Sequence, residues 1–98
     1  MVIKTNDLSE SDIAKMLGIS PALIFYAIQL KDTTLAKYFP PIPDYEYEIG
    51  MQRKYSDKSI EMFREFFDSI KKDKMRKKIW NEWTRRIYNN KNIFGGLY

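Results

Sequence analysis

The chain contains neither cysteine nor histidine among its 98 residues, and each absence excludes a class of site. Without cysteine there is no disulfide framework and no thiolate metal ligand. Without histidine the commonest general base is missing, and a structural zinc site lacks its usual ligands. The carboxylates show no spaced pair in a loop that would indicate a hydrolase. We therefore expect no metal, no cofactor and no enzymatic activity.

Long hydrophobic runs are also absent. The longest, Ala22 to Ile28, falls well short of the roughly 20 apolar residues that span a bilayer, and no signal peptide opens the chain. Hydrophobic residues still make up 44% of the sequence and aromatic residues 15%, which indicates a folded chain. We expect one soluble, cytoplasmic domain with no membrane partner.

Positive charge is scarce in the first half of the chain. Residues 1–50 hold four lysines and seven acids, a net charge of −3, whereas residues 51–98 hold thirteen basic residues and six acids, a net charge of +7. A nucleic-acid binder is basic where it touches phosphate. If the chain binds nucleic acid, its contacts to phosphate must therefore come largely from beyond residue 50.

The most informative stretch is Ile13 to Ala27, whose pattern fits a helix-turn-helix. Ala14 is small where two helices must approach closely, and Gly18 suits a turn with a left-handed backbone. Ser20 and Pro21 combine an N-cap with a proline at the first helical position. The apolar residues spaced to point into the angle between the helices are Ile13, Leu17, Ile19 and Ile24. An ordinary helical hairpin with a glycine turn is the alternative.

Capping signals set the expected helix bounds. Ser9 and Asp12 have the spacing of a capping box, which predicts a first helix from about Glu10 to Leu17. The second helix should run from Pro21 to about Lys31. A short turn from Leu35 to Phe39 should then end at the prolines that follow.

The hydrophobic period changes to that of strands after the prolines. Alternation from Tyr45 to Ile49, a turn at Gly50 and a return from Met51 to Tyr55 predict a β-hairpin, or wing. The predicted fold is mainly α with a small β-hairpin: a winged helix-turn-helix over residues 9–56, followed by one long or two consecutive helices over residues 57–90.

The helical part should begin at a cap on Ser56 or Asp57 and end before a tail at residues 91–98. Its apolar stripe comprises Ile60, Phe63, Phe67 and Ile70, and resumes after a charged run from Lys71 to Lys78. We interpret that run as a solvated face, with a contact to the flank of a duplex as the alternative. The resumed stripe is a candidate dimerisation surface, unless it folds back into the core, and comprises Ile79, Trp80, Trp83 and Ile87.

The stretch from Asp12 to Tyr26, together with Gly50, Arg53, Tyr55 and Ser56, resembles MerR-type regulators. The resemblance covers roughly residues 9–68 and extends to excisionase-like and plasmid-segregation proteins with the same winged head. It implies a winged helix-turn-helix that binds DNA, mostly through the backbone. The implied contact residues are Ser20, Tyr26, Arg53 and Tyr55.

The second helix departs from that family at Phe25, where arginine is usual. No basic residue precedes Lys31 on its exposed face, so the bidentate arginine contact to guanine is missing. Gln29 could contact adenine, and Ala22 or Phe25 could contact thymine methyl groups, which favours A·T-rich sites. Alternatively, Phe25 and Tyr26 pack against the wing or against a partner protein.

Phosphate contacts should come from the wing, provided that its acidic residues point away from DNA. That requires Tyr45 and Tyr47 to face the body of the protein, so that Asp44, Glu46 and Glu48 do not. The complete set of candidate DNA-binding residues is Ser20, Ala22, Phe25, Tyr26, Gln29, Lys31, Arg53, Lys54, Tyr55 and Lys58.

These features favour a small regulator or DNA-organising protein of a phage, plasmid or other mobile element. Its partner would be double-stranded DNA, bound by a homodimer whose two heads contact half-sites about one helical turn apart. The alternative is an interaction module on the same scaffold, which binds a host or polymerase protein through the apolar second helix.

Overall fold

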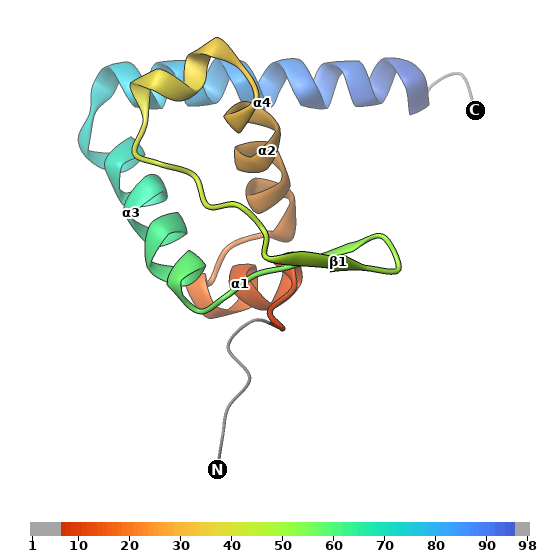
Figure 1. Cartoon of the computed structure of the whole chain (residues 1–98). Helices are drawn as coiled ribbons and strands as arrows, with labels where there is room; N and C mark the ends of the chain where they lie inside the picture. The colour runs from red at the N-terminus through yellow and green to blue at the C-terminus, as the bar shows by residue number, and fades with distance from the viewer. Residues whose placement is uncertain (1–6, 96–98) are drawn as a thin grey trace.

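The computed structural model describes residues 7–95, with side chains placed as far as Asn89. In chain order the elements are α1 (Glu10–Leu17), α2 (Pro21–Lys31), the short 3-10 helix η1 (Thr34–Tyr38), β1 (Tyr47–Ile49), β2 (Gln52–Lys54), α3 (Lys58–Lys72) and α4 (Lys74–Gly95) (Figure 1). The predicted class, mainly helical with a small β-hairpin, is confirmed.

Helix α1 begins at the predicted capping box. The backbone N–H of Asp12 donates to the Ser9 hydroxyl (3.2 Å), and the backbone N–H of Ser9 donates to the Asp12 carboxylate (3.0 Å). The two bonds satisfy donors that the first helical turn leaves without partners. Both ends of α1 agree with the bounds expected from the sequence.

The capping box makes the stability of α1 dependent on pH. The pKa of Asp12 is lowered, first by the backbone hydrogen bond from Ser9 and then by the bond from its hydroxyl. A carboxyl group with a lowered pKa stabilises the fold above its unfolded pKa, and this contribution is lost as the pH falls through the folded pKa. We predict that Asp12→Asn, which keeps the acceptor oxygen but removes the charge of this exposed side chain, lowers the free energy of unfolding at pH 7 by about 0.5 kcal/mol.

Thermal denaturation followed by circular dichroism at pH 7 and pH 3 would measure this difference. It should shrink toward zero at the lower pH, because wild-type Asp12 is then becoming protonated. Ser11→Ala, one residue away on the exposed side of α1, serves as the control. A difference that is equally large at pH 3 would contradict a role for the carboxylate charge.

Helices α1 and α2 meet at a sharp angle. Their axes differ in direction by 116°, inside the range of about 90–120° that is usual for a helix-turn-helix. Gly18 lies between them in the left-handed region (φ +70°), and the N–H of Ile19 donates to the carbonyl of Ala14 (2.9 Å). Ala14 and Ile24 are fully buried. The predicted roles of Ala14 and Gly18 in the turn agree with this geometry.

The start of α2 also follows its sequence signals. The Ser20 hydroxyl accepts the N–H of Ala22 (3.2 Å), and Pro21 occupies the first turn. Thr33 caps η1, which begins one residue earlier than expected. Within the described residues no single helix is long and apolar enough to cross a membrane, and α1 and α2 reach that length and composition only as a bent pair.

The hairpin pairs Tyr47 with Lys54 and Ile49 with Gln52 across an antiparallel register. Both turn residues have positive φ, Gly50 at 53° and Met51 at 68°, as a two-residue hairpin turn requires. Each strand is three residues long, shorter than the expected ranges. A bridge between Leu8 and Tyr55 joins the base of the hairpin to the segment before α1.

The C-terminal part consists of two helices rather than one bent helix. Asp73 is in an extended conformation between α3 and α4, and its carboxylate accepts the N–H of Arg76 (3.0 Å), which caps α4. Helix α4 continues to Gly95, beyond the position where we expected a tail to begin. The rest of that expected tail, residues 96–98, lies outside the described residues.

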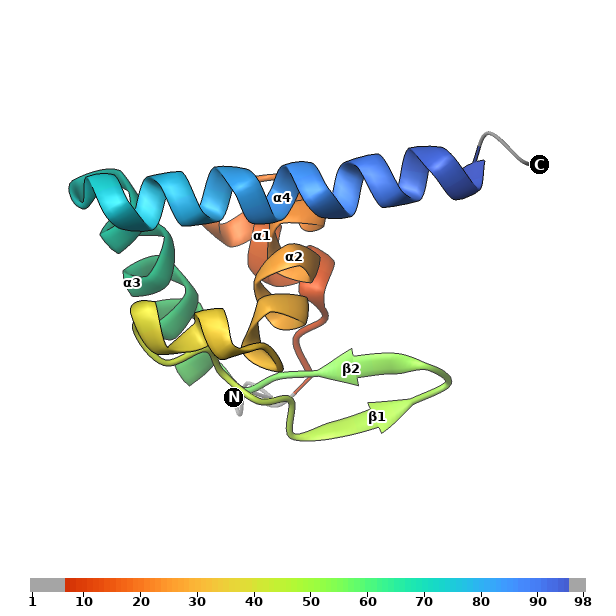
Figure 2. The ribbon, with the colours of Figure 1, turned by 90° about the horizontal axis from the view of Figure 1, so that it is seen from above.

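Helix α4 packs across the ends of α2 and α3, and its far half extends past α2 (Figure 2). Trp80 is 7% exposed, and its ring lies 5.4 Å from that of Phe66 and 5.7 Å from that of Phe67. Ile79 and Trp83 also pack against the core, and Ile87 is half-buried. The dimerisation role expected for Trp80 is therefore wrong, because its indole completes the core of the monomer.

Candidate nucleic-acid interface

Helix α2 presents a narrow exposed stripe. Ala22, Phe25 and Gln29 follow one another at helical spacing and are all exposed, with Phe25 at 41%. Ser20 is exposed at the start of the same helix. The expected outward orientation of Phe25 and Gln29 agrees with the structure, and the stripe carries no charged side chain.

Tyr26 lies at the edge of this stripe. Its side chain is half-buried and packs against the core, and its backbone carbonyl accepts the indole N–H of Trp83 (2.9 Å). The Phe25 and Tyr26 rings meet edge to face, with centroids 6.3 Å apart. Tyr26 is thus held between the exposed face of α2 and α4, and only part of it faces outward.

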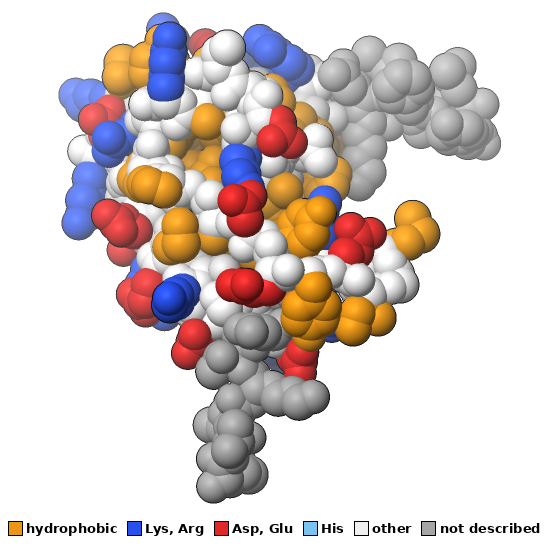
Figure 3. Space-filling view, viewed as in Figure 1, with side chains coloured by type: hydrophobic (Ala, Val, Ile, Leu, Met, Phe, Trp, Pro, Cys, Tyr) orange, Lys and Arg blue, Asp and Glu red, His pale blue; other side chains and the backbone are white. Residues whose placement is uncertain are grey.

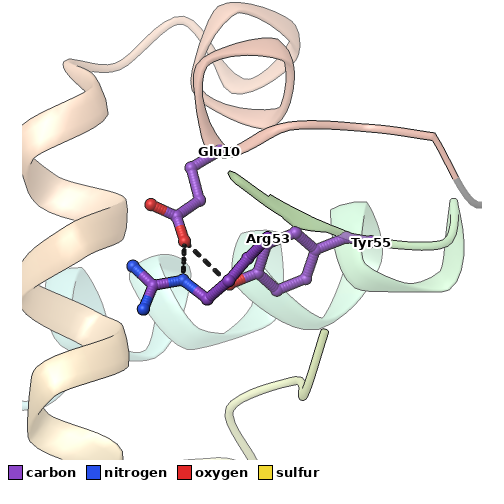
Figure 4. Close-up of polar contacts among 3 residues, drawn as sticks. All are labelled: Glu10, Arg53 and Tyr55. Carbon is purple, nitrogen blue, oxygen red and sulfur yellow. Dashed lines mark hydrogen bonds and ion pairs between the residues drawn. The ribbon is translucent and has the colours of Figure 1, made fainter. Parts of the chain in front are cut away.

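The wing arginine is engaged within the protein. The Nε of Arg53 donates to the Glu10 carboxylate at 2.5 Å, and the Tyr55 hydroxyl donates to the same oxygen at 3.0 Å (Figure 4). The hydrogen bond to Glu10 is the main cause that raises the pKa of Arg53. The Arg53 side chain is 29% exposed. Its charge is therefore largely balanced by Glu10.

Tyr55 cannot contact DNA as expected. The residue is 1% exposed, and its ring lies 6.1 Å from that of Phe63 in the core. Burial, then the neighbouring charge of Glu10, raises the pKa of its hydroxyl well above the ordinary value. The sequence contained no local signal for this arrangement, because Glu10 lies 43 and 45 residues from its two partners.

The other predicted cations differ in accessibility. Lys31 forms an ion pair with Asp44, and its side chain is 29% exposed. Lys54 is half-buried on β2, and Lys58 is exposed at the start of α3. Lys58 is consequently the most accessible of the predicted lysine and arginine contacts to phosphate.

The hairpin register only partly meets the condition set for the wing. Tyr47 is half-buried and its hydroxyl donates to Asp7, but Tyr45 is 46% exposed. Glu46 and Glu48 are exposed, as the condition requires. Of the two tyrosines, however, only Tyr47 packs against the body of the protein. The end of the hairpin is apolar, as the orange side chains at the right of Figure 3 show, with Ile49 61% and Met51 92% exposed.

The basic run forms the corner between α3 and α4. Figures 1 and 2 both place this corner on the side of α2 opposite to the hairpin. Arg76 is half-buried and donates to the backbone carbonyl of Tyr38 (2.7 Å), which holds α4 against η1. The remaining basic side chains of the run are exposed, as expected for a solvated face: Lys71, Lys72, Lys74, Lys77 and Lys78.

No family model, curated protein or solved structure matches this chain. The similarity to MerR-type regulators therefore depends on the short motifs of residues 9–68 alone. Across the described part of the chain, no group of three or more carboxylates is placed to hold a metal ion.

Proposed function

We propose that the protein binds double-stranded DNA as a winged helix-turn-helix domain, with α2 in the major groove. The observation that carries this proposal is the arrangement of α1 and α2. They cross at 116° around Gly18 and leave the Ala22–Phe25–Gln29 stripe uncovered. The proposal favours a protein that regulates transcription or organises DNA in a phage, plasmid or other mobile element.

The chemistry of the stripe favours A·T base pairs. The Gln29 amide can pair with adenine through two hydrogen bonds, and Ala22 and Phe25 offer apolar contact to thymine methyl groups. Ser20 and Lys58 are exposed and suited to backbone phosphates, whereas Arg53 already shares its Nε with Glu10. We expect modest discrimination between sequences.

Fluorescence titration of labelled A·T-rich and random duplexes at two salt concentrations tests this proposal. The affinity of a DNA binder should fall steeply with salt, because bound phosphates release counterions. Gln29→Ala should reduce the preference for A·T-rich duplexes by about tenfold, the value of one bidentate base contact. Met75→Ala, an exposed side chain on the distant corner, is the matched control and should change nothing.

The interaction module remains the second candidate, and a specific observation favours it. The stripe lacks basic residues, the predicted contacts Lys31 and Arg53 form internal ion pairs, and the hairpin ends in exposed Ile49 and Met51. Absence of affinity for every duplex at low salt would overturn the DNA proposal in favour of this one.

A further inference from the structure

An open groove runs between α2 and the middle of α4. It has a volume of about 430 Å³ and is lined by Leu23, Tyr26, Asn81, Thr84, Arg85 and Tyr88. In Figures 1 and 2 α4 continues past α2 on the same side as the hairpin, so α4 and the hairpin flank α2. The groove lies on the α4 side of this arrangement.

The groove adjoins the exposed stripe of α2. Tyr26 is four residues after Ala22 and three before Gln29, so on the helix surface it neighbours both. The hydrogen bond from the Trp83 indole to the Tyr26 carbonyl (2.9 Å) holds the two helices together at this point. The groove and the stripe therefore form one continuous surface with a fixed geometry.

The side chains of the groove suit a sugar–phosphate backbone. Arg85 supplies a guanidinium, Tyr26 and Tyr88 supply hydroxyl groups, and Asn81 supplies an amide, which are the groups that proteins use for phosphate and sugar contacts. Arg85 is exposed, and Tyr88 is 56% exposed. None of the lining residues is acidic.

Charge distinguishes this side of α2 from the hairpin side. Glu46 and Glu48 are exposed on the hairpin, and its Arg53 is paired with Glu10. From Asn81 to Asn89, where α4 lines the groove, the helix by contrast has two basic residues, Arg85 and Arg86, and one acid. The attraction for a polyanion is thus stronger on the α4 side.

We propose that the groove holds the sugar–phosphate backbone of one DNA strand, with Arg85 contacting a phosphate. A helix is about 10–12 Å across and the major groove is about 12 Å wide, so the flanks of an inserted helix meet the two backbones. When the α2 stripe faces the bases, its Tyr26 flank directs one backbone into this groove. This inference rests on the proposed DNA-binding function.

Arg85→Ala in the full chain tests the inference, with Lys78→Ala as the matched control. Both substitutions remove one exposed positive charge from α4, but only Arg85 lines the groove. We expect Arg85→Ala to weaken binding to random and A·T-rich duplexes equally, by about tenfold, and to reduce the salt slope by about one. Lys78→Ala should weaken binding by less than about twofold.

The outcomes separate this inference from the proposed function. Wild-type binding with equal, small losses for both variants would overturn the groove proposal and leave the role of α2 in place. No binding by the wild type would overturn both. If a second copy of this chain occupied the groove, Arg85→Ala would weaken the dimer, and sedimentation without DNA would give the variant a smaller mass than the wild type. This result too would overturn the proposal.

Discussion

Replacing Trp80 with alanine is expected to lower the free energy of unfolding by about 3–5 kcal/mol. The indole is 7% exposed and packs against both Phe66 and Phe67, so truncation leaves a cavity where α4 meets α3. A domain of this size has a total stability of about 5–15 kcal/mol, and the variant should lose a large share of it. Urea denaturation followed by circular dichroism measures the loss.

Tyr88→Ala is the appropriate control, because Tyr88 lies on the same helix and is 56% exposed. Its effect should stay within about 0.5 kcal/mol. If Trp80→Ala left stability unchanged but reduced the mass in solution, Trp80 would belong to a pairing surface and not to the core.

Replacing Tyr55 with phenylalanine should lower the free energy of unfolding at neutral pH but raise it, relative to the wild type, at alkaline pH. At pH 7 the variant loses the hydrogen bond to Glu10, a cost of about 1 kcal/mol. The wild-type fold raises the pKa of Tyr55, so its contribution is complete below the unfolded value near 10 and is lost as the pH rises above it. Above that pH the free energy of unfolding of the wild type falls by about 1.4 kcal/mol per pH unit, whereas that of the variant has no such contribution because phenylalanine does not titrate.

The two stability curves should therefore cross between about pH 10 and 11.5. Denaturant midpoints at pH 7, 9, 10.5 and 11.5 would locate the crossing. Tyr45→Phe, at an exposed tyrosine, corrects for general alkaline effects. Parallel curves for wild type and Tyr55→Phe would show that the Tyr55 hydroxyl is not buried as described.

Local signals predicted much of the fold. The capping box at Ser9 and Asp12, the turn at Gly18 and the Ser20–Pro21 start give α1 and α2 their observed bounds, because these features act within four residues along the chain. Asp73 carried a similar signal, an N-cap residue inside a basic run, and could have indicated the break between α3 and α4.

The candidate site was less predictable, because it depends on contacts between distant residues. The sequence could not indicate that Glu10 would pair with Arg53, or that Asp44 would pair with Lys31. Nor could periodicity decide whether Trp80 and Trp83 pack against their own monomer or against a second one, since both alternatives need the same apolar stripe.

Among the described side chains, the anchors of α4 all lie in its first half. Helix α4 has 22 residues and is therefore about 33 Å long. Arg76 fixes its first turn to Tyr38, Trp80 packs against Phe66 and Phe67, and Trp83 donates to the Tyr26 carbonyl. Arg85 comes two residues after the last of these anchors, so its position relative to α2 is set by the Trp83 contact and not by the joint at Asp73.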